Sequence, residues 1–312
     1  MKFINKLKNY IPVIILILTY SVEVRSDINV VTSIKPIHSI ASNIMDGVSE
    51  PTLLVEGTTS PHSYIMKPSH VEAINNADLI FFVSDEHLET FLSKPLSNVN
   101  NNAKIVELMD NEDLFVLKFR EKNIYLGDDH DDHDDHDEHA HGEFDIHIWL
   151  DPFNAKVIAN NIAEELSKLD PANTSTYQNN RDKFVEKVSD TEEKISQQLD
   201  HYVSYVTFHD AYQYFENRFD VASSGALTIN PDVMPGARQL SDVRELMADN
   251  DIHCIFSEPQ FNPKVVEVIA EDTNTKMGIL DPLGATIPLG KDHYFGVLTD
   301  IADSLEGCGH DH

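Results

Sequence analysis

Seven short apolar runs constrain the fold of this chain more than any other feature of its sequence. They lie at residues 28–34, 51–55, 78–84 and 103–108, and then at 204–209, 253–259 and 275–280. Runs that are nearly continuous in apolar residues are typical of strands buried on both faces of a parallel sheet. Their division into two groups predicts an α/β protein with two parallel-sheet lobes, and 312 residues are enough for two domains.

Helix signals lie between these runs. Ser69 with Glu72 matches a capping box, and Asn262 followed by Pro263 matches an N-cap with a proline in the first turn. The order strand, helix, strand from Cys254 to Leu280 therefore predicts a βαβ unit.

A long helical pattern connects the two groups of strands. It begins near Asn154 and resumes after Pro171, which either starts a new helix or kinks the first one. Its second part carries one apolar stripe over about 30 residues, or roughly 45 Å of helix. We therefore expect α/β lobes at residues 27–153 and 201–312, joined by the long helix within residues 154–200, with a cleft between them.

The first residues have the pattern of an export signal. Three lysines precede an apolar run from Ile11 to Leu18, and Val24 and Ser26 have the spacing of a cleavage site. A membrane anchor is the alternative, but the run is shorter than the roughly 20 residues that span a bilayer. We expect a signal peptide at residues 1–26 and, since no cysteine follows the run for lipid attachment, a protein released into the periplasm.

Charge and cysteine content narrow the function further. The formal net charge of −30 argues against nucleic-acid binding, which requires basic surfaces, and leaves cation binding open. Cys254 and Cys308 are the only two cysteines. In an exported chain an isolated pair is expected to form a disulfide.

Four candidate metal ligands follow predicted strands or precede a predicted helix: His62, His147, His209 and Asp281. Ligands of open α/β sheets bind beyond the carboxyl ends of the strands. Three imidazoles and one carboxylate suit tetrahedral Zn²⁺. The alternation in residues 144–150 further predicts an ordered strand around His147. A ligating histidine usually donates its other N–H to a carboxylate or carbonyl, so Asp210 and Glu258 are the candidates for that supporting role.

An acidic tract at residues 128–143 contains histidines of a different kind. It has no apolar run and no lysine or arginine, so we expect a disordered loop rather than a folded element. It is either a weak zinc collector or a solvated acidic loop with incidental affinity. The histidines of this weak secondary metal loop are His130, His133, His136, His139 and His141.

Six motifs along the chain resemble signatures of one family, in the same order: "TSPHSYIMKPS", "DIHIWLDP", "FHDAYQYFE", "INPDVMPGARQL", "FSEPQFNP" and "MGILDPLG". On these motifs the sequence resembles the solute-binding proteins of cluster A-I ABC metal transporters, and within them the zinc-binding members. The resemblance covers nearly the whole mature chain. It implies that His62, His147 and His209 bind the metal with Asp281 near the same ion.

Two positions in the sequence bear on which metal ion is bound and on its fourth ligand. Manganese-binding relatives have glutamate at position 209, and histidine favours zinc because Mn²⁺ prefers more oxygen donors. Some zinc members have a glutamate directly before the first histidine, whereas this chain has Pro61. The fourth ligand is therefore Asp281 or water.

The function that the resemblance implies is high-affinity capture of Zn²⁺ in the periplasm and delivery to an inner-membrane ABC permease, by a monomer without enzymatic activity. A manganese-binding member of the same family is one alternative. A zinc hydrolase is another, because three histidines and a water also form catalytic sites. Against the hydrolase, Asp281 would close the site and no general base stands out beside the histidines. A metal-dependent adhesin would need a surface anchor, and we find none in the sequence.

Overall fold

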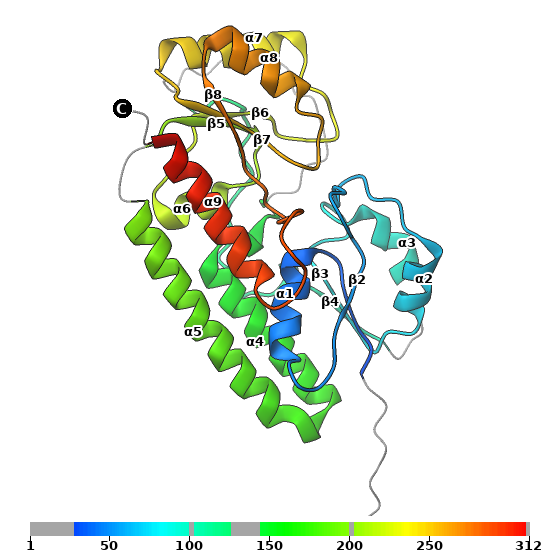
Figure 1. The fold of residues 1–312 in the computed structure, drawn as a ribbon. Helices are drawn as coiled ribbons and strands as arrows, with labels where there is room; N and C mark the ends of the chain where they lie inside the picture. Colours follow the sequence, from blue (N-terminus) through cyan, green and yellow to red (C-terminus); the bar gives the residue numbers. More distant parts are fainter. Residues whose placement is uncertain (1–27, 100–102, 126–143, 200–202, 310–312) are drawn as a thin grey trace, which may run out of the picture.

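The computed structural model describes residues 28–99, 103–125, 144–199 and 203–309, which form two α/β lobes and a group of long helices (Figure 1). The signal peptide predicted at residues 1–26 and the five histidines of the acidic tract lie outside the described residues. Among the residues described, no helix is both long and apolar enough to cross a membrane.

The first lobe is built on a parallel sheet with the strand order β2-β1-β3-β4. Its central strands are buried, and Val31 of β1 pairs with Ile80 of β3. The strands are β1 (Val30–Thr32), β2 (Thr52–Leu53), β3 (Leu79–Phe82) and β4 (Lys104–Glu107). The helical elements of this lobe are α1 (Lys35–Ile44), α2 (Pro68–Asn75), η1 (Thr90–Leu92), α3 (Ser93–Leu96) and η2 (Leu108–Asp110).

The second lobe repeats this arrangement with the order β6-β5-β7-β8, again all parallel. Strands β5 and β7 lie at the centre and are buried at every position. The strands are β5 (Tyr205–His209), β6 (Gly225–Thr228), β7 (Cys254–Ser257) and β8 (Lys276–Ile279). The helices are α6 (Gln213–Phe219), α7 (Ala237–Asp249) and α8 (Lys264–Thr273), of which α7 and α8 lie together over the sheet (Figure 1).

The predicted α/β fold with two parallel sheets is confirmed, and all seven apolar runs contain strands. The βαβ prediction is also confirmed, because β7, α8 and β8 follow one another and the two strands pair in parallel. Asn262 precedes α8, and its Oδ1 accepts a hydrogen bond from the backbone N–H of Lys264 at 3.1 Å, but Pro263 and not Asn262 stands at the N-cap.

The predicted long connection is a pair of packed helices rather than one rod. α4 (Pro152–Leu169) ends before a short 3₁₀ turn, η4 (Pro171–Asn173), and α5 (Thr174–Gln198) then runs beside it (Figure 1). Proline thus starts a new helix. α5 has 25 residues, or about 37 Å, somewhat shorter than the 30 expected. Its predicted apolar stripe is buried, at Tyr177, Phe184, Val188, Ile195 and Leu199.

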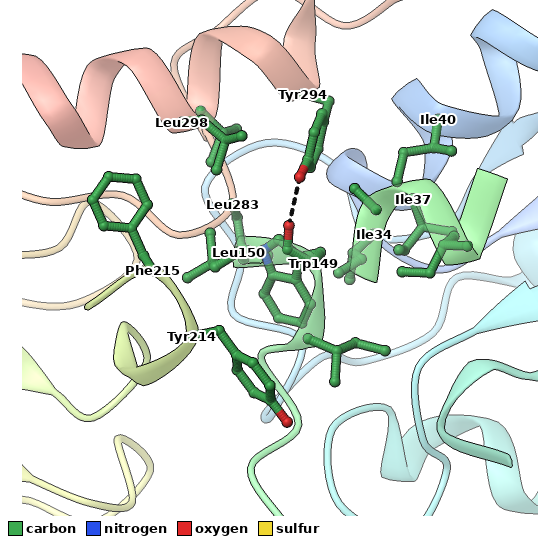
Figure 2. Close-up of a cluster of buried hydrophobic side chains, with 14 of the residues drawn as sticks. Ile34, Ile37, Ile40, Trp149, Leu150, Tyr214, Phe215, Leu283, Tyr294 and Leu298 are labelled. Atoms are coloured by element: carbon green, nitrogen blue, oxygen red, sulfur yellow. Dashed lines mark hydrogen bonds between the residues drawn. The ribbon is translucent and has the colours of Figure 1, made fainter. Parts of the chain in front are cut away.

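The C-terminal helix α9 (His293–Gly309) leaves the second sheet and packs against α1 and α5 (Figure 1). The predicted disulfide is present: Cys254 of β7 is bonded to Cys308 near the end of α9, 54 residues further on. Figure 2 shows the core where these parts meet. There Tyr294 donates a hydrogen bond to the carbonyl of Trp149 at 3.0 Å, and the Trp149 indole N–H donates to the carbonyl of Pro282 at 2.7 Å.

Two local predictions were wrong. The capping box at Ser69 and Glu72 is not formed, because α2 already begins at Pro68 and Lys67 stands at its N-cap without a side-chain bond. Proline fits the first helical position since its fixed φ is helical and its missing N–H is not needed there. The strand expected around His147 is instead a 3₁₀ helix, η3 (Ile148–Leu150), all of whose residues are buried.

Candidate metal centre

His62 lies in the loop that follows β2 in the first lobe. Its backbone N–H donates to the Ser60 hydroxyl at 3.3 Å, a local bond that fixes the turn carrying the imidazole. The side chain is partly exposed, in contrast to the other two histidines of the site.

His147 stands immediately before η3, where the chain leaves the first lobe. One carboxylate oxygen of Asp145 accepts both the backbone N–H of His147 at 2.9 Å and its ring Nδ1 at 2.7 Å. The first of these bonds closes an Asx turn, which bends the backbone just before η3. Both side chains are buried, so the ring is held in one orientation.

His209 is the last residue of β5, in the centre of the second sheet. Its Nδ1 lies 2.6 Å from Oε1 of Glu258, which follows the neighbouring strand β7. The two residues meet because the carboxyl ends of adjacent parallel strands lie at the same edge of a sheet. Both are buried, at 3% exposure each.

The three histidines converge on one point. Each offers a ring nitrogen, and these atoms lie within 4.8 Å of one another. Because Nδ1 of both His147 and His209 faces a carboxylate, Nδ1 carries the proton and Nε2 keeps a lone pair for a metal. The two Nε2 atoms are 3.4 Å apart. Nitrogen ligands at 2.0–2.1 Å from a tetrahedral Zn²⁺ lie about 3.3–3.4 Å from each other, so the spacing fits zinc.

The cavity at this point is very small. Its volume is about 10 Å³, close to the least that holds one water molecule. The lining combines the three histidines with Trp149 and with residues of both lobes, among them Gln260 and Leu283. Such a cavity has room for one group of about the size of a water molecule and is too small for an organic substrate.

The structure brings three of the four predicted metal ligands together. Asp281 does not belong to the group whose ligand atoms converge among the described residues. Its Oδ1 accepts from Gln260 Nε2 at 2.7 Å and from the backbone N–H of Leu283 at 3.1 Å, and its Oδ2 accepts from Ala285 N–H at 2.5 Å.

The two predicted supporting carboxylates differ in their contacts. Glu258 contacts the ring of His209, whereas Asp210 accepts a hydrogen bond from Arg120 at 2.8 Å. Burial raises the pKa of Asp210 to about 6, although the Arg120 charge acts in the opposite direction. Sequence reasoning missed Asp145, the carboxylate on His147. The sequence feature that could have identified Asp145 is the spacing Asp-x-His. An aspartate two residues before a histidine can form an Asx turn that orients the histidine.

Comparison with known proteins shows the family to which the chain belongs. The family model for ZnuA, described as zinc-uptake complex component A periplasmic, matches residues 30–308. The chain belongs to the ZnuA family. The High-affinity zinc uptake system protein ZnuA of Brucella abortus (strain 2308) is 40% identical over 304 residues, which cover 89% of this chain and 91% of that protein. The protein of the same name from Yersinia pestis is 37% identical over 288 residues, covering 89% of this chain and 90% of that one.

A solved structure shares the fold of this ZnuA family member. The periplasmic zinc binding protein TroA from Treponema pallidum superposes with a TM-score of 0.75 at 21% identity, covering 91% of this chain and 99% of that one. At this identity the likeness concerns the fold: two α/β lobes joined by helices.

Proposed function

We propose that this protein captures Zn²⁺ in the periplasm and delivers it to the permease of an ABC transporter for zinc uptake. The observation that carries the proposal is the convergence of His62, His147 and His209, whose ring nitrogens lie within 4.8 Å of one another. The Nε2 atoms of His147 and His209 are 3.4 Å apart, a spacing that suits tetrahedral zinc. Membership of the ZnuA family, and the names of the relatives, support the same reading.

The buried carboxylates behind two of the histidines favour a divalent cation. Asp145 and Glu258 bring two negative charges to the site while leaving the imidazoles as the contacting groups. They balance the two positive charges of the ion, and they fix the ring orientations that binding requires. Their hydrogen bonds thereby prepare the site before the ion arrives, which lowers the entropic cost of binding.

The ligand types and the size of the cavity distinguish zinc capture from manganese binding and from hydrolysis. Nitrogen donors at all three converging positions favour Zn²⁺ over Mn²⁺, which prefers oxygen. The cavity leaves no room for an ester or peptide substrate, which speaks against a hydrolase. The protein acts as a monomer without enzymatic activity, exported by the signal at residues 1–26, and zinc is its transported ligand.

The proposal is tested by titrating metal-free protein with Zn²⁺ and with Mn²⁺ in a calorimeter, beside native mass spectrometry. One tight Zn²⁺ per monomeric chain is expected, with weaker Mn²⁺ binding. His209→Ala should abolish the tight site and leave the fold intact. His209→Glu should lower the ratio of zinc affinity to manganese affinity, because it adds an oxygen donor.

His253→Ala is the matched control, because it removes a histidine of the same lobe outside the cluster. Unchanged tight affinity in His209→Ala, or an equal loss in His253→Ala, would refute the assignment. Hydrolysis of an activated ester by the zinc-loaded protein would favour the enzyme instead.

A further inference from the structure

Strand β4 forms one edge of the first sheet, and the described residues place no strand on its outer side. It pairs with β3 in parallel, and the backbone N–H of Lys104 donates to the Asp78 carbonyl at 2.9 Å. Successive residues of a parallel strand bond to opposite sides, so Lys104 and Val106 bond toward β3. The backbone N–H and C=O groups of Ile105 and Glu107 therefore face away from the sheet. Such a row of backbone groups can pair with another extended chain.

A groove of about 670 Å³ lies beside this edge. All four residues of β4 line one part of it, and residues of α4 line another, among them Phe153 and Val157. The Phe153 side chain is 43% exposed, which is a large fraction for an aromatic ring. Pockets that hold a ligand usually have volumes of roughly 300–1,000 Å³. The groove therefore has room for the side chains of a segment that pairs with β4.

The groove is acidic. Its lining includes one lysine, Lys104, and six carboxylates: Glu107, Asp110, Glu112, Asp113, Glu164 and Glu165. Among the described residues, Glu165 is the one carboxylate of this set with an ion pair, to Lys168 at 2.7 Å. Burial raises the pKa of Glu107, a hydrogen bond from Ser84 opposes this shift, and the charge of Asp110 adds to it. Cationic side chains of a partner would reduce this repulsion.

The second sheet shows how this chain covers an edge of the same kind. The segment before the acidic tract lies along the edge strand β6, where Ile124 forms an antiparallel bridge with Gly225. This segment also contributes a cation, because Arg120 donates to Asp210 at 2.8 Å and to Glu216 at 2.5 Å. An extended segment with a basic side chain thus pairs with a sheet edge next to carboxylates within the molecule itself.

We propose that the edge of β4 and the groove beside it dock an extended, lysine- or arginine-rich segment of a partner protein, which adds a strand to the first sheet. Backbone bonds to Ile105 and Glu107 provide affinity, and the carboxylates select a basic sequence. The acidic tract of this chain is an unsuitable occupant, since its nine carboxylates between residues 128 and 143 have the same sign of charge as the groove. None of the three converging histidines lines the groove, so docking is independent of zinc.

The test uses the full chain and, as the probe, a synthetic peptide that alternates lysine and valine. Fluorescence anisotropy should show saturable binding that weakens as salt is added. Amide exchange followed by NMR should slow at the backbone N–H groups of Ile105 and Glu107 when the peptide is bound. The same peptide with methylated backbone nitrogens keeps its charge and has no backbone donor, so it should bind at least threefold more weakly.

Two variants of the protein separate charge from backbone pairing. Glu112→Gln combined with Asp113→Asn removes two exposed charges of the groove and should weaken peptide binding at least threefold. Asp242→Asn combined with Glu245→Gln on α7 is the matched control, because it removes two exposed charges elsewhere and should bind like wild type. Ile105→Pro removes a backbone donor on the outer side of β4 and should also weaken binding at least threefold.

Equal affinity for the two peptides, or no loss in the Glu112 and Asp113 double variant, would overturn the inference even if Ile105→Pro did not fold. Absence of peptide binding to wild type would overturn it too. A wild-type dimer that Ile105→Pro makes monomeric would assign the edge to a second copy of the chain and likewise overturn it. Zinc titration of the same samples keeps the two proposals apart, since both double variants should bind zinc like wild type.

Discussion

Asp145 and Glu258 act on the metal site through the histidines that they contact. Each accepts a hydrogen bond from Nδ1 of one histidine, at 2.7 Å and 2.6 Å, and each is buried. A carboxylate in this place fixes the tautomer and raises the basicity of the nitrogen that faces the ion. His62 is more exposed than these two histidines, and its backbone N–H donates to the Ser60 hydroxyl.

Glu258→Gln should therefore weaken zinc binding by about 10–100-fold without removing a ligand. The substitution takes away the negative charge behind His209 while keeping the size of the side chain. Competition with a chelator of known affinity measures the change. Glu267→Gln on the exposed face of α8 is the control and should bind like wild type. Equal affinity of Glu258→Gln and wild type would mean that Glu258 has no part in binding.

At the scale of elements, strand ends and helix starts bring the site together, and α9 ties the second sheet to the helices of the first lobe. The disulfide joins β7 to α9, so it fastens the strand that precedes Glu258 to that helix. His293 at the start of α9 lies buried under the loop that follows β8, with Nε2 2.9 Å from the Leu283 carbonyl.

Reduction of the disulfide should lower the melting temperature and leave the three histidines able to bind zinc. A crosslink that closes a loop of 54 residues stabilises a fold by roughly 4 kcal/mol on the chain-entropy estimate. Thermal melts with and without reductant, together with zinc titration of the reduced protein, check both parts. An unchanged melting temperature would contradict the first part, and loss of tight zinc binding at a temperature where the fold persists would contradict the second.

Acid should destabilise the metal-free protein partly through His293. Burial lowers the pKa of His293 in the folded state below its ordinary value of 6.5. The unfolded chain therefore takes up the proton first, and the stability present above pH 6.5 is lost as the pH falls toward the folded-state pKa. Lys35 and His38 lie close enough to add to this effect.

Melts in the presence of a chelator between pH 7.5 and 5 measure this effect. His293→Gln cannot titrate, so its melting temperature should fall less steeply than that of wild type. An identical slope in the two proteins would show that His293 does not contribute.

Sequence reasoning predicted the elements whose signal is an unbroken apolar run and missed those that depend on tertiary contacts. Strand β6 was missed because only one of its four residues, Leu227, has a large apolar side chain. Its Gly225 is needed because a Cβ there would lie 2.6 Å from the carbonyl oxygen of Asn123, which the fold alone brings close. The three histidines were found through their strand ends and the family resemblance. The contacts of Asp145 and Asp281 depend on local turns that a periodicity argument does not resolve.

At the scale of the whole molecule, the largest buried cluster contains residues of both lobes, of α4 and α5, and of α9. The metal site lies where these parts meet, since its histidines come from the first lobe, from the segment leading into α4, and from β5. A smaller cluster lies within each lobe. The site thus depends on the arrangement of the whole chain, and none of its three converging ligands comes from the acidic tract.

Deletion of residues 128–143 should therefore leave one tight zinc site and remove weaker additional binding. The composition of the tract predicts a disordered loop, in which an ion would have to order the histidines at roughly 1–2 kcal/mol per residue fixed, whereas the three converging histidines are already held in place. Zinc titration of the deletion variant and of the full chain, at neutral and mildly acidic pH, measures both classes of site. Loss of the tight site on deletion would mean that the tract supplies a ligand.

The most direct test of the account is a diffraction measurement of zinc-loaded crystals at energies above and below the zinc absorption edge. We predict one strong anomalous peak per chain, bonded to a ring nitrogen of His62, His147 and His209 at about 2.0–2.1 Å. A strong peak elsewhere, or a peak that lacks any one of these three histidines, would contradict the central claim.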